Sequence, residues 1–395
     1  MFESLKLQPP DALLNITKSY LDDERLEKIN LGVGVYQDQS GKTPLMEAVA
    51  IAEQNLAAEQ STKSYLPMSG FSPFVSSLSN LVLGQSIHSG LNNRLEGIQT
   101  AGGCGALRLG AELIQKSNPM ARIWIPNMSW PNHEPIFLAA NFELVNYSYY
   151  NDEGNFIDIA KMMDQLGSAK PGDVIVLHGC CHNPTGADLS FDEWKALTEL
   201  VLKKGLVPFL DIAYQGLGVD LEEDATGWRY MASKVPELLA SVSCSKNFGL
   251  YRERTGILIL LGESSKSVRA AASTLLVIAR SIYGMPPSHG ARIVAEVLMD
   301  QQLSQLWSDE LCSMRQRLKW VRSELTSRLS VSLRDFSFIE GQLGMFSILG
   351  LEPSEVDSIR DDFGVYMAGS SRVNLCGLNE SNIDYFCDAL NRTLL

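Results

Sequence analysis

One lysine stands in a setting that suits covalent chemistry. Lys246 lies in the segment S-C-S-K-N-F-G (243–249), directly after the apolar run 239–244, which predicts a strand. Two serines flank it closely, and Arg254 follows in the same stretch. A lysine that is partly desolvated beside a cation loses its proton more easily and can form a Schiff base with an aldehyde. The segment therefore predicts a reactive amine rather than a solvated surface lysine.

A carboxylate also stands at the end of a predicted strand. Asp211 closes the apolar run 205–211 and is followed by Tyr214 in the segment D-I-A-Y-Q-G. Burying a carboxylate without a partner is very costly, so Asp211 requires a cation or hydrogen-bond donors around it. Taken alone, it fits a structural ion pair or a helix cap as well as a functional site.

Two turns with polar or glycine residues also adjoin predicted elements. The turn C-H-N-P-T-G (181–186) comes after the apolar run 173–178, and G-G-C-G (102–105) opens a helical pattern. At such a glycine turn, the free backbone N–H groups and the helix dipole favour a phosphate. Glycines that simply allow a tight turn are an equal interpretation. The nucleotide-binding spacings G-x-G-x-x-G and G-x-x-x-x-G-K-[ST] are both missing.

Together, the four segments match the needs of one cofactor, pyridoxal 5'-phosphate. This cofactor requires a lysine for its aldehyde, a carboxylate for its ring nitrogen and donors near its phenolate oxygen. Its phosphate requires a glycine turn with hydroxyls and an arginine. Because the segments end predicted strands, we expect them to meet at the edge where open α/β sheets bind ligands.

The elements that must position these residues form an α/β core. Between about residue 100 and residue 262, short apolar runs alternate with helical patterns, and runs that are apolar throughout suit strands covered on both faces. The sequence therefore predicts a largely parallel sheet. The predicted strands are 121–126, 142–147, 173–178, 205–211, 239–244 and 256–261.

The C-terminal third predicts a smaller α+β domain. Helical patterns cover 263–280 and, as one long helix, 289–329. Turn-rich segments with short strands and a helix from about residue 380 follow, and the N-terminal stretch through LGVGVY (31–36) completes this domain. The short strands are expected at 345–350, 364–369 and 372–377.

Composition bounds the class of protein. The chain has 395 residues, 45% of them apolar, and a net charge of −13, which excludes a disordered or fibrous chain and a basic footprint for nucleic acid. No apolar run is long enough to cross a bilayer and no signal peptide is recognisable, so we expect no membrane association and a cytoplasmic location. The seven cysteines lack C-x-x-C spacing, so we expect reduced thiols and no metal site.

The motifs resemble those of the class I pyridoxal-phosphate aminotransferases, in particular the aspartate and aromatic amino acid subgroup. The resemblance rests on S-x-S-K-N-F-G-L-Y-x-E-R, C-C-H-N-P-T-G and D-x-A-Y-Q-G, and continues almost end to end through LGVGVY, YLPMSG, SWPNH, PPSHGA, MRQR, FGVY and SRVN. It implies fold type I, with a mixed, mostly parallel seven-stranded sheet, and a homodimer with shared active sites. The implied domains are an N-terminal arm (1–14), a small α+β domain (15–42 and 313–395) and a large pyridoxal-phosphate-binding domain (43–312).

The resemblance also implies roles for the residues around the cofactor ring. Lys246 matches the Schiff-base lysine that moves the proton, and Asp211 the carboxylate at the pyridine nitrogen. Asn183 and Tyr214 match donors to the phenolate oxygen. Trp130 matches the aromatic that stacks on the ring, with His133 behind Asp211. The implied catalytic residues are Lys246, Asp211, Tyr214 and Trp130.

Further roles concern the phosphate and the substrate. Arg372 matches the arginine that binds the substrate α-carboxylate. Arg280 of the partner chain matches the arginine that binds a second carboxylate. His178 and His182 are expected to be satisfied structural histidines. The implied phosphate-binding residues are Gly102, Gly103, Cys104, Ser243, Ser245, Arg254 and, from the partner chain, Tyr65. The implied substrate-binding residues are Gly34, Trp130, Asn183, Arg280 and Arg372.

The implied activity is transfer of the α-amino group of an amino acid, with aspartate favoured, to 2-oxoglutarate in a ping-pong cycle. Val35, Thr43 and G-K-T-P favour aspartate, whereas YLPMSG and Met285 favour an aromatic amino acid donor. A pyridoxal-phosphate β-lyase or decarboxylase and a non-catalytic ligand-sensing module stay open as alternatives. Departures from the family pattern gather near the phosphate and substrate and are consistent with a shifted substrate range. They are Cys104, Met128, Ile282, Gly284, Met285 and Ser371.

Overall fold

The chain forms two compact units. The computed structural model describes residues 2–7, 12–151 and 153–395, so residues 1 and 8–11 of the expected N-terminal arm lie outside the described residues. The large unit comprises Pro44–Arg317 and Gln342–Gly344. The small unit comprises Met1–Thr43, Leu318–Gly341 and Met345–Leu395.

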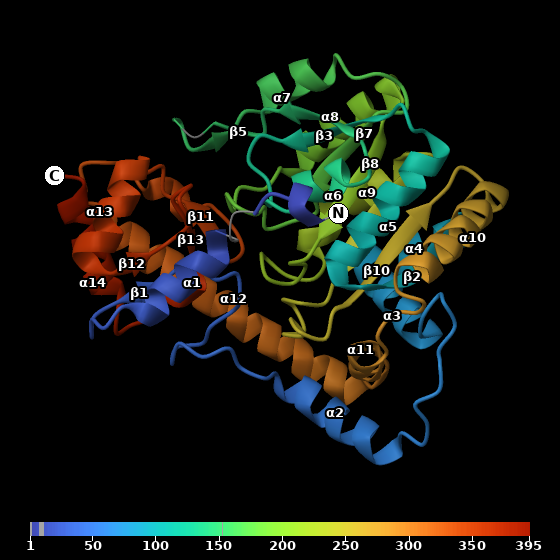
Figure 1. Ribbon diagram of the computed structural model, residues 1–395, viewed down its shortest axis with the longest axis horizontal. Helices are drawn as coiled ribbons and strands as arrows, with labels where there is room; N and C mark the ends of the chain where they lie inside the picture. Colours follow the sequence, from blue (N-terminus) through green and yellow to red (C-terminus); the bar gives the residue numbers. More distant parts are fainter. Residues whose placement is uncertain (1, 8–11, 152) are drawn as a thin grey trace. The chain divides into compact units, whose positions relative to one another are not determined.

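The large unit is built on one seven-stranded sheet (Figure 1). β10 runs antiparallel to both of its neighbours, and the other neighbouring strands are parallel. The predicted α/β fold with a mixed, mostly parallel sheet is confirmed. In spatial order the strands are β2 (Leu95–Ala101), β10 (Thr255–Leu261), β9 (Leu238–Ser243), β8 (Val207–Ile212), β7 (Val174–His178), β3 (Arg122–Pro126) and β4 (Glu143–Tyr147).

Helices connect these strands and cover the sheet. The connection through α8 shows how the sequence sets the helix ends: Ser190 and Glu193 form a capping box at its start, and Gly205 ends it in the left-handed conformation. A two-stranded ribbon, β5 (Tyr150–Asn151) with β6 (Phe156–Ile157), projects from the same unit. The helices are α2 (Glu47–Glu59), α3 (Ser72–Leu83), α4 (Gln85–Leu91), α5 (Gly102–Ser117), α6 (His133–Leu138), α7 (Ile159–Leu166), α8 (Phe191–Lys204), α9 (Glu223–Lys234), α10 (Ser265–Ile282), α11 (His289–Met299) and α12 (Gln301–Leu329), whose residues from Leu318 on belong to the small unit.

The expectation of one helix over 289–329 was wrong. The structure has two helices, α11 and α12, separated by Asp300, whose backbone is extended (φ −88°, ψ 123°). The Asp300 carboxylate accepts hydrogen bonds from the backbone N–H groups of Gln302 and Leu303 at 2.8 and 2.9 Å. Asp300 therefore ends one helix and caps the next, as short polar side chains do at helix N-termini.

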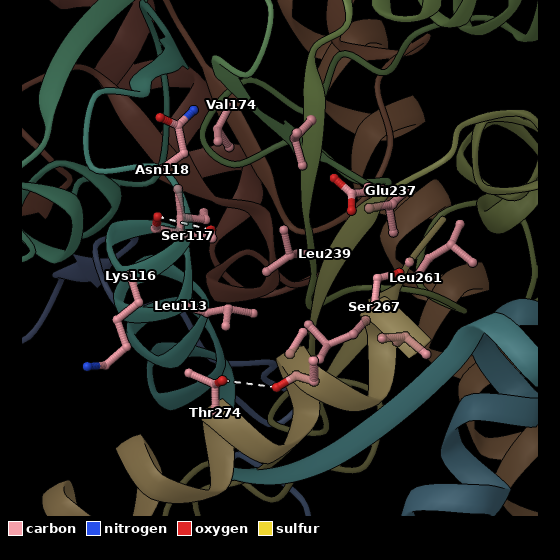
Figure 2. A pocket seen from close by; sticks show the side chains of 18 of the residues that line it. Leu113, Lys116, Ser117, Asn118, Val174, Glu237, Leu239, Leu261, Ser267 and Thr274 are labelled. Carbon is pink, nitrogen blue, oxygen red and sulfur yellow. Dashed lines mark hydrogen bonds between the residues drawn. The ribbon is translucent and has the colours of Figure 1, made fainter. Parts of the chain in front are cut away.

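A cavity of about 570 Å³ opens at the amino ends of the parallel strands, between α5 and α10 (Figure 2). Leu113 of α5, Leu239 of β9 and Leu261 of β10 line it, together with the small residues Ala270 and Ala271 of α10. Because alanine side chains are short, α10 leaves this part of the sheet less completely covered. The hollow is mostly apolar.

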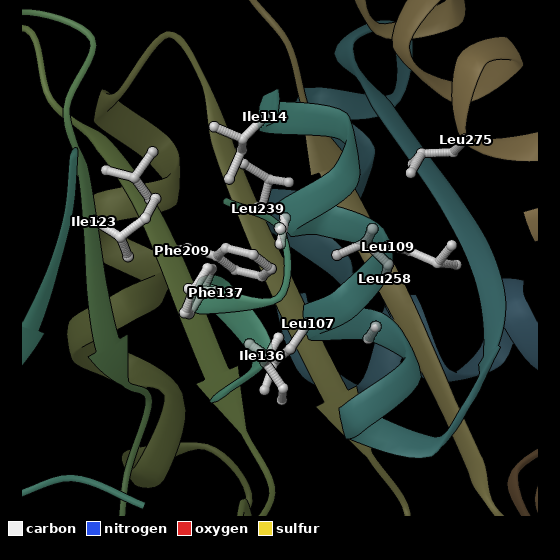
Figure 3. Packing of buried hydrophobic residues seen from close by; sticks show 14 of the residues in the cluster. Leu107, Leu109, Ile114, Ile123, Ile136, Phe137, Phe209, Leu239, Leu258 and Leu275 are labelled. Carbon is white, nitrogen blue, oxygen red and sulfur yellow. The ribbon is translucent and has the colours of Figure 1, made fainter. Parts of the chain in front are cut away.

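Towards the middle of the sheet, the space under α5 is filled (Figure 3). Leu107 and Leu109 of α5 belong to a buried cluster with Phe137 of α6 and Phe209 of β8. Gly110 makes the approach of α5 to the sheet possible, because a Cβ there would lie 2.3 Å from the Phe209 ring. A larger residue at position 110 would push α5, and the residues at its start, away from the sheet.

The small unit contains short strands and helices. β1 (Ile29–Asn30) pairs in parallel with β12 (Val365–Tyr366), and β11 (Phe346–Ile348) pairs antiparallel with β13 (Arg372–Asn374). The helices are α1 (Ala12–Asp22), α13 (Pro353–Phe363) and α14 (Ile383–Thr393), and short 3₁₀ turns occur at Phe2–Ser4, Ser337–Ile339 and Leu375–Gly377, with one in the large unit at Asn92–Arg94. No helix among the described residues has the length and apolar character needed to cross a membrane.

One predicted strand of the small unit is shorter in the structure. The strand expected over 372–377 ends at Asn374, whose side chain accepts a hydrogen bond from the Cys376 N–H and starts a 3₁₀ turn. Local side-chain and backbone bonding there replaces a longer ladder.

Candidate active site

The carboxyl edge of the large sheet gathers the predicted polar residues. β7, β8 and β9 are parallel and in register, so that His178 lies opposite Asp211 and Asp211 lies opposite Ser241. Lys246 follows β9 directly, and its Nζ lies 5.5 Å from the centre of the Tyr214 ring and 6.0 Å from that of Tyr251. The amine is thus held among aromatic rings at a strand end.

Asp211 has a hydrogen-bonded partner behind it. Its Oδ2 lies 3.1 Å from His133 Nε2, and His133 Nδ1 lies 2.7 Å from the Ser129 hydroxyl. Burial would raise the pKa of Asp211, but the hydrogen bond from His133 and the nearby positive charge of Lys246 outweigh it and lower that pKa below the ordinary value. Asp211 is therefore an ionised carboxylate at neutral pH.

A row of aromatic rings supports this carboxylate. The Trp130 ring meets His133 edge to face at 5.4 Å, His133 meets His178 at 5.2 Å, and His178 lies 4.2 Å from His182. Burial lowers the pKa of His178 well below its ordinary value and that of His182 to about 3. Both rings are therefore neutral at pH 7. They pack in the large unit without adding positive charge to the site.

The expectation that His182 is fully satisfied was only half right. Its Nδ1 lies 2.8 Å from the Thr185 hydroxyl, and its ring stacks on Tyr149 at 4.1 Å. Its Nε2, however, is buried without a hydrogen-bond partner among the described residues. One hydrogen bond and the stacking on Tyr149 therefore hold this ring in place.

Asn183 and Tyr214 complete the group around Lys246. The Asn183 side-chain amide donates to the Tyr214 hydroxyl at 3.4 Å, and both side chains are buried. Asn183 comes from the turn after β7 and Tyr214 from the turn after β8. Their polar atoms therefore lie close enough together to donate two hydrogen bonds to one ligand oxygen.

The start of α5 forms an anion cradle. The register of β10 places Ala101 opposite Thr255 and Gly256 opposite Ser243, which brings the first turn of α5, Arg254 and the serines after β9 together. A Cβ on Gly102 would lie 2.7 Å from Arg254 Nη2, so only glycine leaves room for the guanidinium there.

The serines complete that cradle. A Cβ on Gly103 would lie 3.3 Å from Ser243 Cβ, and the Ser243 hydroxyl donates to the Ser245 hydroxyl at 3.0 Å. Cys104 is the third residue of α5, and its Sγ lies 3.6 Å from the Asn132 side-chain amide. A guanidinium, two hydroxyls and the free N–H groups of a helix start are the donors that bind a phosphate.

Two predicted residues of the large unit stand apart on exposed segments. Tyr65 is 93% exposed, and Arg280 lies in the last turn of α10 with its Nη1 4.0 Å from the Met68 sulfur. Met285 accepts a hydrogen bond from the Leu66 N–H at 3.2 Å. The exposed tyrosine and arginine therefore belong to a local surface with two methionine sulfurs.

The predicted carboxylate-binding residues of the small unit are close to one another. Arg372, on β13, is buried, donates from Nη2 to the Gly32 carbonyl at 2.8 Å and stacks over the Phe346 ring at 4.6 Å. A Cβ on Gly34 would lie 3.5 Å from the same ring. Ser371 has φ +58°, the left-handed region in which glycine is unstrained, so this departure carries a backbone cost.

Sequence reasoning missed two residues that contact the predicted group. Tyr251 lies near the Lys246 amine. The Ser129 hydroxyl lies 2.7 Å from His133 Nδ1 and 3.4 Å from His178 Nε2, so it links the two rings. Ser129 belongs to the quoted motif S-W-P-N-H and Tyr251 to S-x-S-K-N-F-G-L-Y-x-E-R, and these motifs are the signal that could have identified both residues.

The fold and this group of residues define the chain as an α/β enzyme with a lysine, a carboxylate and an anion cradle at one sheet edge. It belongs to the family described as aminotransferase class I and II, whose model matches residues 27–390. The resemblance seen in the motifs is thereby confirmed.

Relatives with two different names match the chain over nearly its whole length. It is 42% identical to an aspartate aminotransferase of Salmonella typhi and 41% identical to an aromatic-amino-acid aminotransferase of Paracoccus denitrificans, each alignment covering 99% of both chains. The crystal structure of an aromatic-amino-acid aminotransferase from Burkholderia pseudomallei, covalently bound to pyridoxal phosphate, matches with a TM-score of 0.97, 39% identity and full coverage of both chains.

Proposed function

We propose that the protein is a pyridoxal-phosphate-dependent transaminase that transfers the α-amino group of an amino acid, with aspartate as the leading donor, to 2-oxoglutarate in a ping-pong cycle. The observation that carries the proposal is the arrangement of Lys246, the Asp211 carboxylate and the Arg254 cradle at the carboxyl edge of one sheet. Family membership and relatives of both names support it.

The residues present fit the cofactor. Arg254, Ser243, Ser245 and the first turn of α5 would hold its phosphate, and Gly102 leaves the space that this cradle needs. Lys246 would hold its aldehyde carbon, with the Trp130 ring on one face of the cofactor ring. When bound, the cofactor supplies a conjugated system that accepts the electrons left behind when Cα loses its proton.

Asp211 and its neighbours set the charge of the site. Its ionised carboxylate would bind the protonated ring nitrogen, and the hydrogen bond from His133 fixes its orientation. The Asn183 amide and the Tyr214 hydroxyl would donate to the phenolate oxygen on the other side of the ring. His178 and His182 stay neutral at pH 7, so they add no positive charge beside Asp211.

Lys246 would move the proton. At the strand end beside Tyr214, its amine would take a proton from the substrate Cα and later return it. The rings of Tyr214 and Tyr251, whose centres lie 5.5 and 6.0 Å from this amine, would help to orient it.

Substrate carboxylates would be bound by two arginines. Arg372, oriented by its bond to the Gly32 carbonyl and by the Phe346 ring, would bind the α-carboxylate as a fork, with Gly34 beside it. Arg280 and Tyr65 stand on an exposed part of the large unit, which supports a homodimer in which each chain supplies them to the site of its partner.

The large unit would serve as the cofactor-binding domain, and we assign the enzyme to the cytoplasm.

The second candidate function is an aromatic amino acid aminotransferase. The specific observation in its favour is that thioethers, Met68 beside Arg280 and Met285 at Leu66, line the surface where a distal carboxylate would bind. Thioethers accept apolar and aromatic side chains well. A donor with a large apolar side chain is therefore compatible with this surface if Arg280 turns towards solvent.

A panel of amino donors tested with 2-oxoglutarate, scored by the oxo acid produced, distinguishes these functions. Arg280→Leu should lower kcat/KM for aspartate by about 3 to 5 kcal/mol of transition-state stabilisation, the scale of a broken buried charge pair. Phenylalanine should lose much less, because Arg372 still binds its α-carboxylate. Equal losses would make Arg280 structural.

Two results would overturn the transaminase itself. Release of ammonia or CO₂ in place of an oxo acid would indicate a lyase or decarboxylase. A change in cofactor absorbance on adding amino acid, with no turnover, would indicate a ligand-sensing module.

A further inference from the structure

Two adjacent cysteines and a distant aspartate form a buried group outside the candidate active site. Cys180 and Cys181 follow β7, and Asp224 lies in the first turn of α9. Their two sulfurs and a carboxylate oxygen all lie within 4.8 Å of one another, and all three residues are buried. The proposed transamination uses none of them.

The Asp224 carboxylate retains one unused acceptor position. Its Oδ2 accepts hydrogen bonds from the N–H groups of Gly216 and Gly218, each at 2.9 Å, and its Oδ1 accepts one from Val219 at 2.7 Å. An ionised carboxylate offers about four lone-pair positions, two on each oxygen. The remaining position is on Oδ1, and the three backbone bonds hold that oxygen in place.

Two glycines keep the space between this oxygen and the sulfur open. A Cβ on Gly218 would lie 2.6 Å from Asp224 Oδ1 and 3.1 Å from Cys181 Sγ, and a Cβ on Gly344 would lie 3.1 Å from the same sulfur. Cys180 and Asp224 also line a cavity of about 200 Å³, which has room for water. The group is therefore a cradle with access to a small polar hollow.

We propose that Cys180, Cys181 and Asp224 form a binding site for one soft divalent cation of the Zn²⁺ and Cd²⁺ class. Two thiolate sulfurs and Asp224 Oδ1 would be the protein ligands, and a water in the adjoining cavity would be the fourth. Thiolates select such cations over Mg²⁺ and Ca²⁺, which prefer oxygen ligands. Zn–S bonds are about 2.3 Å long and Zn–O bonds about 2.0 to 2.2 Å. To bind one ion at these lengths, the three ligand atoms need to move towards one another by roughly 1 Å at most.

Binding requires the loss of two protons. The thiolate, and not the thiol, is the form of cysteine that binds a metal ion. Each sulfur that binds the cation releases one proton to solvent, so binding is tighter at higher pH. The filled site carries two thiolates, one carboxylate and one divalent cation, with a net charge of −1.

The site would tie together two segments of the large unit. Cys181 and His182 donate hydrogen bonds from their backbone N–H groups to the Asp188 carboxylate. The residue that follows His182 is Asn183 of the candidate active site. A cation held by both cysteines and Asp224 would anchor this turn to the start of α9. We therefore expect it to stabilise the fold, as any ligand that binds only the native state does.

The test uses the full chain with its cofactor, reduced beforehand and shown to contain seven free thiols after denaturation. Titration with Cd²⁺ should give a sulfur-to-cadmium charge-transfer band that saturates at one equivalent, with release of two protons, and Zn²⁺ should displace it. Cys180→Ser and Cys181→Ser should each weaken Cd²⁺ binding by more than about 100-fold, beyond the typical cost of an outer-shell contact. Cys312→Ser, at a half-buried thiol elsewhere, should bind like the wild type.

One further variant tests the space between the ligands and guards against misfolding. Gly218→Ala keeps every ligand but fills the gap, and should weaken Cd²⁺ binding while circular dichroism shows a native fold. Unchanged affinity in Gly218→Ala, with loss in the cysteine variants, would overturn the placement of the cation between Asp224 and Cys181. Absence of the band in reduced wild-type protein, or an equal band in Cys181→Ser, would overturn the site altogether.

Discussion

The two edges of the large sheet differ in what they bring together. At the carboxyl edge, Lys246, Asp211 and Asn183 follow three neighbouring strands and lie among aromatic rings and histidines. At the amino edge, a cavity of about 570 Å³ is lined mainly by leucine, valine and alanine. The cavity at the amino edge thus lacks the convergent reactive groups of the carboxyl edge.

This difference shows that the direction of the strands decides where the reactive groups gather. Parallel strands all end at the same edge, so the polar residues that follow them meet there. The amino-edge hollow exists because Ala270 and Ala271 of α10 are small, and Leu113 and Leu239 leave it apolar. If this contrast is correct, substitutions at the carboxyl edge should change catalysis, and those at the amino edge should change stability.

The sharpest way to break the contrast is Lys246→Ala. Loss of the amine removes both the covalent attachment of the cofactor and the base at Cα, so turnover should fall to background. The measurement is the visible absorbance of the holoenzyme together with oxo acid production. A covalent bond between the cofactor and another lysine in this variant would show that the reactive amine was assigned wrongly.

Asp211→Ala should be the next most severe change. The cofactor phosphate would still be held by Arg254 and the serines, so cofactor retention should fall far less than kcat. Without the carboxylate the ring nitrogen loses its proton, and the barrier to proton removal from Cα rises. Cofactor Kd and kcat measured on the same preparation separate the two effects. Near-normal kcat with cofactor bound would make Asp211 structural.

The same residue predicts a pH dependence of stability. The pKa of Asp211 is lower in the folded protein, so its ionised form contributes stability above its unfolded pKa of about 3.9, and this contribution is lost as the pH falls through the lowered folded value. In Asp211→Asn, the free energy of unfolding should therefore fall less steeply over this acidic range. Identical acid profiles for both proteins would contradict the lowered pKa.

A substitution at the amino edge should show the opposite behaviour. Leu239→Ala should cost about 2 kcal/mol of unfolding free energy, the low end for a buried leucine, because Leu239 already borders a hollow. kcat and KM should stay within about twofold, since Leu239 lies at the start of β9 and Lys246 follows its end. Urea unfolding and steady-state kinetics test this pair of expectations. A large loss of kcat without loss of stability would mean that the cavity takes part in catalysis.

The sequence predicts the carboxyl edge better than it predicts the ends of elements. Runs such as 205–211 are apolar throughout, so both the strand and the Asp211 that closes it were recognisable. β2 was missed as a strand, because Gln99 and Thr100 interrupt its apolar pattern although both are buried. Asp300 was passed over as a helix break, because a single aspartate is compatible with a continuous helix until its side chain is seen to cap the next turn.

Side-chain groups that join distant segments of the chain could not be predicted from the sequence. Asp224 joins Cys180 and Cys181 through the packing of α9 near the turn after β7, and no spacing in the chain indicates it. The row formed by His133, His178 and His182 likewise depends on side-chain packing between strands. Local pattern gives the residue types at strand ends, whereas tertiary packing decides their partners.

The smallest expected effect is that of Cys104→Thr, at the candidate phosphate cradle. Cys104→Thr should tighten cofactor binding by about 0.5 to 1.5 kcal/mol, the net contribution of one hydrogen bond, because a hydroxyl is a better donor than a thiol. Unfolding of the apoprotein should change little, since position 104 is half-buried at the start of α5. Cofactor Kd from equilibrium dialysis, with Cys104→Ala as the variant that lacks a donor, measures this difference. Weaker retention by the threonine variant would show that the cradle is shaped around the sulfur, through the Asn132 amide that contacts it.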